Sequence, residues 1–471
     1  MAQPSQNQGG GRGARSFHAL RRVFGLIGGA CFVLGVFATV PLLAGGGAEP
    51  PKDGAAAKPS PITTLATDDD IARVEDPVRL RIEGKAALAS GNKELAKKLF
   101  TASVERDELN HYSEFAGGSL GDTVIQELMG EFEASRATWN TLIDEDVATG
   151  YREIAVFSVD PDKQKLLDRA KAKIEDLAAK AKAGEEALIY VTKKGQKRFL
   201  TKMTQEEVNK AFEAGERVRY AYIEELDLSE RTFPNLVRCQ RCLIGNVNAW
   251  GSTFEDQLKL DRTIVIGDVH LGKKWKGEVN KSAFIAAGRY NTVYLDNTVV
   301  LGNLNLESAE VYGRVFNAPL SYVEGTGDFR NARFRNTAEF RYAKFGGPIN
   351  AKGAEFGGAS YFGYTQIGGL DLSRVVVQKN PLYFNSARFT GPVALEKCEL
   401  LRGATFENAT FEEDVTLRQC RVYDRFNMSR SLSRKNLEVR QMQLTDFDFL
   451  GGRVLGKADF RDSVFTGNAR F

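Results

Sequence analysis

Two closely spaced cysteines are the residues whose types and spacing most directly suggest chemistry. Cys239 and Cys242 form a Cys-x-x-Cys pair, a spacing that suits a redox disulfide or half of a zinc site. A structural zinc site needs four ligands, and neither a second pair nor a neighbouring histidine supplies the other two. We therefore predict no metal site. We interpret both residues, with Cys398 and Cys420, as buried core thiols, and a disulfide between Cys239 and Cys242 is the alternative.

Histidine, the commonest general base, is scarce in this chain. The 3 histidines are His18, His111 and His270. The aliphatic stretch that ends at His270 is similar to the repeats of hexapeptide acyltransferases, which use one histidine on a left-handed β-helix. Those repeats step by six residues, whereas the most regular part of this chain steps by five. No nucleophile, base and orienting group converge in the sequence. We expect no active site and no cofactor, and an acyltransferase that uses His270 is the lesser alternative.

Acidic residues also occur in small groups. Asp446 and Asp448 lie two apart on a predicted strand, where outward acids are ordinary. Asp68 to Asp70 precede a predicted helix at Ile71, and carboxylates at that position stabilise the positive end of the helix dipole. Neither group requires a metal ion.

The last third of the chain contains a regular repeat of apolar residues, which predicts its secondary structure. Phenylalanine recurs at a step of five, as from Phe329 to Phe334 and from Phe340 to Phe345, and alanine often lies two residues before it. Two apolar residues two apart lie on one face of an extended segment. The predicted repeat core is Phe329, Ala332, Phe334, Ala338, Phe340, Ala343, Phe345, Ala354, Phe356, Ala387, Phe389, Ala404, Phe406, Ala409, Phe411, Ala458, Phe460, Phe465, Ala469 and Phe471.

This pattern resembles the pentapeptide-repeat family, whose members fold as right-handed quadrilateral β-helices. The resemblance covers residues 327–471, with lapses at 373–382 and 423–456, and a less regular repeat precedes it from residue 226. It implies coils of roughly 20 residues that stack at strand spacing. We therefore expect a mainly β protein with one solenoid over 226–471, of about 12 coils and about 60 Å.

The N-terminal region has the signature of a membrane anchor. Residues 1–22 are basic, and residues 23–44 form a stretch of 22 uncharged residues, long enough to span a bilayer. The arginines before this segment predict a cytoplasmic tail and place the bulk of the chain outside, in the periplasm of a Gram-negative bacterium. A cleaved signal peptide is the alternative. Gly25 and Gly29 form a GxxxG pair that could pack two anchor helices together.

Helices are predicted between the anchor and the solenoid. Residues 45–70 form a linker rich in glycine, alanine and proline, and residues 71–187 have helical periodicity. A hairpin and a helix over 188–225 should cover the first coil of the solenoid. Residues 77–107 resemble a single tetratricopeptide repeat through Gly84, Gly91, Ala96, Phe100 and Ser103. That resemblance implies a helical hairpin.

The net charge of the chain argues against one class of function, nucleic-acid binding. A net charge of +3 predicts no strong attraction to nucleic acid. We predict a non-enzymatic, membrane-anchored scaffold of a bacterial envelope assembly, which binds other proteins through the solenoid. Self-association is expected through a last coil, at Phe471, that no capping helix covers. The alternative is a surface for envelope glycan, with stacking groups at Tyr312, Tyr322, Tyr342 and Tyr361.

Overall fold

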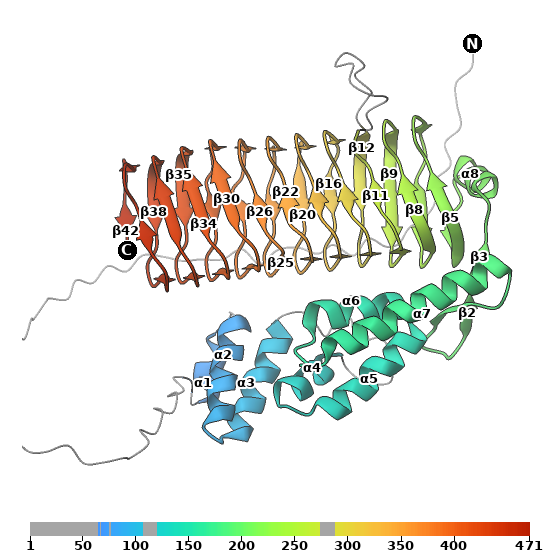
Figure 1. Ribbon diagram of the computed structural model, residues 1–471, viewed down its shortest axis with the longest axis horizontal. Coiled ribbons are helices and arrows are strands. Elements are labelled where there is room, and N and C mark those ends of the chain that lie inside the picture. The colour runs from blue at the N-terminus through green and yellow to red at the C-terminus, as the bar shows by residue number, and fades with distance from the viewer. Residues whose placement is uncertain (1–64, 66, 75–76, 107–119, 274–287) are drawn as a thin grey trace, which may run out of the picture. The chain divides into compact units, whose positions relative to one another are not determined.

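The computed structural model describes residues 65, 67–74, 77–106, 120–273 and 288–471. Within them, an α-helical region precedes a mainly β solenoid of about 12 turns (Figure 1). The predicted transmembrane helix, with Gly25 and Gly29, lies outside the described residues, and so does the linker up to residue 64. Among the helices that are described, none has both the length and the apolar character needed to cross a membrane.

Seven helices of the described chain precede the first strand, and two of them form the predicted hairpin. They are α1 (Asp68–Ala72), α2 (Pro77–Ala89), α3 (Lys93–Arg106), α4 (Leu120–Leu128), α5 (Phe132–Glu145), α6 (Val147–Phe157) and α7 (Lys163–Ala183). In the hairpin of α2 and α3, a side chain at Gly84 would overlap the ring of Phe100, so only glycine allows this close approach. Gly91, with φ of 83°, follows α2.

Three details of the helical region go beyond the prediction or differ from it. Within the predicted helical region, Gly130, with φ of 86°, separates α4 from α5. Helix α6 lies within the region predicted to be helical, 71–187, although its own bounds were not predicted. Almost every residue of α6 is buried, polar ones included. Helix α1 begins at Asp68, three residues before the predicted start, and Thr67 is its N-cap.

The predicted hairpin and capping helix are both present. Strands β1 (Leu188–Val191) and β2 (Lys197–Phe199) pair antiparallel. Helix α8 (Gln205–Glu213) begins with a reciprocal capping box, in which the Thr204 and Glu207 side chains each accept a hydrogen bond from the other residue's backbone N–H. Its buried side chains belong to the solenoid core, so α8 covers the first coil.

Each regular coil contains four short strands, and equivalent strands of successive coils pair in parallel. One coil consists of β17 (Tyr322–Val323), β18 (Gly327–Asp328), β19 (Arg333–Phe334) and β20 (Thr337–Glu339). The next consists of β21 (Lys344–Phe345), β22 (Ile349–Asn350), β23 (Glu355–Phe356) and β24 (Ser360–Tyr361). The strands of the solenoid begin with β3 (Thr201–Lys202), earlier than predicted, and end with β42 (Ala469–Arg470).

The coil is longer than the five-residue step predicts. Tyr322 pairs with Lys344, 22 residues later, whereas four steps of five would give roughly 20. The five-residue step from Phe329 to Phe334 is followed by one of six to Phe340, so five-residue and six-residue corners alternate. The five-residue step predicted from the sequence is therefore correct for every second corner of the coil and one residue too short for the others.

The tighter corner is a turn with a left-handed residue. At Asn331, φ is 56°, and the Ala332 N–H donates to the Phe329 carbonyl at 3.0 Å, as in a type II turn. Left-handed residues recur about every 11 positions along the solenoid, so two opposite corners of each coil carry one. Asparagine and glycine suit this conformation, whereas Tyr342 and Tyr364 adopt it although they are bulky.

The core of the solenoid is a set of aromatic stacks parallel to its axis. Phe362 and Phe384 stack with ring centroids 4.7 Å apart, and Phe384 and Phe406 with centroids 4.8 Å apart. All of the predicted core residues from Phe329 to Phe411 are buried. The five in the last coil are not, because no further coil covers them in the structure: Ala458, Phe460, Phe465, Ala469 and Phe471.

Removing one ring from a stack should destabilise the whole solenoid. Phe384→Ala leaves a cavity between Phe362 and Phe406, and we expect it to lower the free energy of unfolding by about 3–5 kcal/mol. The control, Tyr423→Ala, removes a side chain that is 52% exposed and should change it by less than about 0.5 kcal/mol. Urea unfolding followed by circular dichroism measures both. Equal effects of the two changes would contradict the stacked core.

Candidate functional site

The cysteines of the solenoid are buried and free. Cys239, Cys242, Cys398 and Cys420 have no disulfide partner among the described residues. Cys398 Sγ donates to the Leu372 carbonyl at 3.0 Å. A hydroxyl group takes the equivalent place in a later coil, where Ser463 Oγ donates to the Val439 carbonyl at 2.8 Å. A hydrogen bond with Cys420, together with burial, raises the pKa of Cys398, so the thiol is a weak nucleophile. The buried-thiol interpretation is confirmed.

The other groups singled out in the sequence have structural contacts. His270 on β11 (Val269–His270) is half-buried, and its Nε2 lies 3.0 Å from the Lys273 carbonyl. Asp448 pairs with Arg425 and Arg470, and Asp446 accepts a hydrogen bond from the Asn468 N–H. Nowhere in the described part of the chain do three potential metal ligands come together.

The four tyrosines considered for glycan stacking each have a neighbour against the ring. Tyr322 is buried beside Tyr151, with centroids 5.3 Å apart. Tyr342 stacks on Tyr364 at 5.0 Å, and Tyr361 stacks on Tyr383 at 5.0 Å. The guanidinium of Arg289 covers Tyr312. Sugar stacking requires an open aromatic face, so these residues are not arranged as a row of free platforms.

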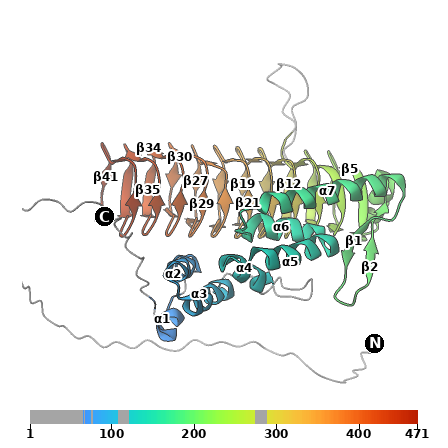
Figure 2. The same cartoon turned by 60° about the horizontal axis from the view of Figure 1, so that its bottom comes forward.

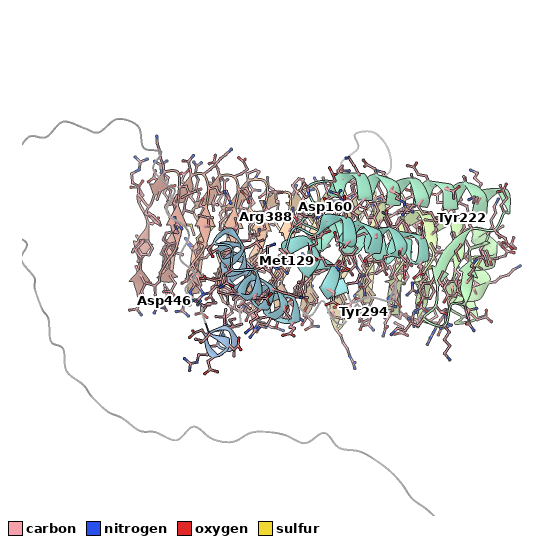
Figure 3. The ribbon with its side chains drawn as sticks, turned by 90° about the horizontal axis from the view of Figure 1, so that it is seen from below. Met129, Asp160, Tyr222, Tyr294, Arg388 and Asp446 are labelled. Carbon is pink, nitrogen blue, oxygen red and sulfur yellow. The ribbon has the colours of Figure 1, made fainter. Side chains whose placement is uncertain are left out.

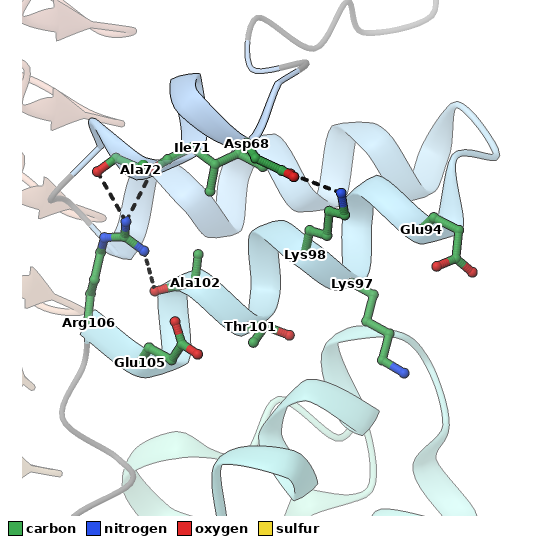
Figure 4. A pocket seen from close by; sticks show the side chains of 10 residues that line it. All are labelled: Asp68, Ile71, Ala72, Glu94, Lys97, Lys98, Thr101, Ala102, Glu105 and Arg106. Atoms are coloured by element: carbon green, nitrogen blue, oxygen red, sulfur yellow. Dashed lines mark hydrogen bonds and ion pairs between the residues drawn. The ribbon is translucent and has the colours of Figure 1, made fainter.

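A shallow hollow beside α1 and α3 is lined by residues that form an ion pair and hydrogen bonds between these two helices (Figure 4). Lys98 pairs with Asp68 at 2.9 Å. Arg106 donates to the Ile71 carbonyl at 3.2 Å and to the Ala102 carbonyl at 3.0 Å. These contacts hold α1 against α3, and we assign them a structural role.

One side of the solenoid is covered by helices of the preceding region. Figures 1 and 2 both show α6 and α7 along the earlier coils. The outward residues of that side are apolar and buried under the helices, and they share one cluster with α6 and α7: Tyr222, Leu243, Ile264, Val299 and Tyr322. They lie on β5 (Ala221–Asp227), β8 (Leu243–Asn248), β10 (Ile264–Val265), β13 (Val299–Val300) and β17.

A row of left-handed corner residues beside this side makes the polar contacts to the helices. We call it the corner row: Tyr220, Arg241, Arg262, Asn297, Leu320, Tyr342, Tyr364, Ser386, Asn408 and Arg430. Arg241 forms a buried ion pair with Asp146 and lies over the Tyr190 ring at 3.4 Å. Asn297 accepts a hydrogen bond from Arg152. The first half of the row is therefore matched to the helical region.

Charged contacts extend the same interface. Lys171 pairs with Glu324 at 3.2 Å, and the Tyr151 hydroxyl donates to Glu324 at 3.3 Å. Glu153 is fully buried beside Arg152, and burial raises its pKa. Buried charges with matched partners fix the position of one surface on another, because a shifted position would leave them unpaired. These contacts match the helical region to this side of the solenoid.

A cleft opens where the covering helices diverge from the later coils. One part, of about 910 Å³, lies between α2, α6, α7 and the coils from β17 to β33 (Thr410–Phe411). A second part, of about 830 Å³, continues toward α1. Both parts are lined by Ile82 and by the corner-row residues Tyr364, Ser386 and Asn408. In Figure 3, Asp160 on the helical wall and Arg388 on the solenoid wall mark this cleft.

Two lysines lie deep in the cleft. Lys163 donates to the carbonyls of Ala155 at 2.8 Å and Ser158 at 3.0 Å, and Lys344 donates to the same Ala155 carbonyl at 3.0 Å. Burial, with the nearby charge of Lys344, lowers the pKa of Lys163 to about 7. Burial also lowers the pKa of Lys344. Among the described residues, the acceptors of these hydrogen bonds are backbone carbonyls, and neither ammonium group donates to a carboxylate.

Comparison with known proteins supports the repeat. Residues 328–376 and 384–432 match the family model "Pentapeptide repeats (9 copies)". The chain carries pentapeptide repeats. No curated protein and no solved structure matches it. The matched residues include Tyr364, Ser386, Asn408 and Arg430, the corner-row residues that line the cleft. The helical region lies outside the match.

The sequence itself indicates which side of the solenoid is covered, through pairs of adjacent apolar residues in the early strands. Leu243-Ile244, Ile264-Val265 and Val299-Val300 place apolar residues at both positions of a short strand, one inward and one outward. The outward member must be covered. From β21 to β33 the outward position is polar, as at Lys344 and Arg388. The change marks where the covered side ends and the cleft begins.

Breaking the corner-row ion pair should loosen the helical region. Arg241→Met leaves the Asp146 carboxylate buried and unpaired, and we expect a loss of about 3–5 kcal/mol of unfolding free energy. Lys182→Met is the control, since Lys182 and Glu224 form a solvent-exposed pair, and such pairs contribute little to stability. Urea titration measures both. A smaller effect at Arg241 than at Lys182 would contradict the matched interface.

The solenoid thiols should resist labelling. The fifth cysteine of the chain, Cys31, lies outside the solenoid and is replaced by serine for this test. In this Cys31→Ser variant of the native protein, we expect a thiol-reactive maleimide to label none of the four buried cysteines until urea is added. Peptide mass spectrometry without reductant checks that Cys239 and Cys242 are both reduced. A peptide lighter by the mass of two hydrogens would instead show the alternative disulfide.

Proposed function

We propose that this protein is a non-enzymatic scaffold that binds a protein partner in the cleft between its helical region and its right-handed quadrilateral solenoid. The observation that carries this proposal is the corner row. Its first half is occupied by the helical region, whereas Tyr364, Ser386, Asn408 and Arg430 line an open cleft. A rigid solenoid with a docked helical region presents that cleft in one fixed shape.

The contacts of the chemically suggestive residues favour a binding role. The thiols, His270 and the aspartates have structural partners, and pentapeptide-repeat solenoids are generally non-enzymatic. The hairpin of α2 and α3, which resembles one tetratricopeptide repeat, contributes a wall of the cleft through Ile82 and Lys85. Its role here is to complete a groove with the solenoid.

The membrane anchor over residues 23–44 and the periplasmic location are part of the proposal. They rest on the uncharged segment and the basic residues before it. With this topology the cleft would face other envelope proteins. Self-association through Gly25 and Gly29 or through the last coil remains a prediction.

Glycan binding is the second candidate and is less well supported. The rings of Tyr342 and Tyr361 are each covered by another tyrosine, which leaves few free faces for sugar stacking. An acyltransferase role for His270 would require a second catalytic group, and the described contact of its ring is a backbone carbonyl.

Affinity purification of the tagged full-length protein from detergent-solubilised native membranes tests the proposal. We expect stoichiometric recovery of other envelope proteins, identified by mass spectrometry, because the scaffold presents a fixed docking site. The matched control carries Arg241→Met, which should reduce recovery by loosening the helical region. Recovery of this protein alone, or only of copies of itself, would contradict the scaffold role.

A further inference from the structure

The cleft has a strong excess of positive charge, although the chain as a whole carries only +3. The acidic residues that line it are already paired, Asp160 with Arg136 at 2.6 Å and Glu407 with Arg430 at 3.5 Å. Its basic lining residues come from both walls: Arg73, Arg79, Arg81, Lys85, Lys163, Lys344, Arg388 and Arg430. Of these, Arg388 also pairs with Glu412 at 3.1 Å, as Arg430 does with Glu407. Charge complementarity therefore calls for an acidic occupant.

The same cleft exposes apolar side chains on its helical wall. Ile82 on α2 is 63% exposed, and Val159, between α6 and α7, is 44% exposed. Both line the cleft beside the lysines. An occupant that uses the whole surface needs apolar as well as acidic groups. Nucleic acid would use an aromatic stacking face, and the Tyr364 ring is stacked on Tyr342.

The solenoid wall of the cleft extends over several coils. Its outward residues are Lys344 on β21, Gln366 on β25 (Gln366–Ile367), Arg388 on β29 (Arg388–Phe389), Thr410 on β33 and Leu432 on β36 (Leu432–Ser433). Four coil spacings of about 4.8 Å give about 19 Å, the length of an extended peptide of about six residues.

We propose that the cleft binds an extended, acidic and partly apolar peptide segment of a partner protein. This inference rests on the proposed scaffold function and specifies the chemistry of the partner. Acidic side chains of the segment would meet Lys344 and Arg388 on the solenoid wall and Arg79 and Lys85 on α2. Its apolar side chains would contact Ile82.

Binding should be coupled to the protonation of Lys163. The charged groups that face Lys163 are Glu127 from α4, Lys344 from β21 and Arg388 from β29, and the two cations oppose its charge. A bound carboxylate would favour the charged form and raise the pKa from about 7. Binding then takes up a proton, so affinity should increase as pH falls from 8 to 6 at constant salt.

A direct binding experiment tests the inference. The probe is a fluorescein-labelled decapeptide of alternating glutamate and leucine, and its counterpart has lysine in place of glutamate. Fluorescence anisotropy with the full-length protein in nonionic detergent, corrected for empty micelles, measures both. We expect binding of the acidic peptide and not of the basic one.

Matched variants place the binding in the cleft. Arg79→Glu with Lys85→Glu should weaken binding about tenfold or more, since it reverses two charges on α2. Lys194→Glu with Lys197→Glu makes the same change at the β1–β2 turn, outside the cleft, and should leave affinity within about twofold. Thermal unfolding checks that both variants remain folded, and Ile82→Ser tests the apolar contact. Equal affinities of the two double variants would overturn the inference. So would tighter binding of heparin or of a single-stranded oligonucleotide.

The same variants separate this inference from the proposed function. If the native partners are recovered equally with wild type and with Arg79→Glu plus Lys85→Glu, the scaffold role holds and the acidic-segment inference fails. If wild type recovers no partner, the scaffold role itself fails. Loss of the partners only in the cleft variant supports both.

Discussion

The structure depends on one constraint: each coil of the solenoid buries its aromatic residues only when the next coil covers them. The stack of Phe362, Phe384 and Phe406, with centroids less than 5 Å apart, follows from the strand spacing of the coils. Helix α8 meets the same need at the first coil by placing Val208 and Phe212 over it. The result is a continuous core in which every coil is held by its neighbours.

Stacked coils also place equivalent outward residues in straight rows, and this makes the solenoid a platform. Along one side, the outward residue is apolar from Tyr222 to Tyr322 and polar from Lys344 to Thr410. The helical region covers the apolar part and is fixed there by buried ion pairs such as that of Arg241 with Asp146. The cleft forms where the rows continue and the helices no longer cover them. Its shape is therefore a consequence of two rigid parts meeting.

Sequence reasoning predicted the solenoid, because small and large apolar residues two apart directly report an inward strand face. It did not predict the 22-residue coil, since the six-residue corners, such as that between Phe334 and Phe340, lack a repeated marker. The buried side of the solenoid was detectable from pairs such as Val299-Val300. The cleft was not, because Lys85, Lys163 and Arg388 are far apart in the sequence and come together only through the docking of the helices.

The central claim is that the helical region has one fixed position on the solenoid, which makes the cleft a preformed site. Its most direct test is a distance measurement between spin labels at Lys85→Cys on α2 and Lys379→Cys on a coil, in the full-length Cys31→Ser protein. Electron paramagnetic resonance should give one narrow distance distribution, unchanged by dilution. A broad distribution, or two populations of distances, would show that the helical region moves on the solenoid and would contradict the account.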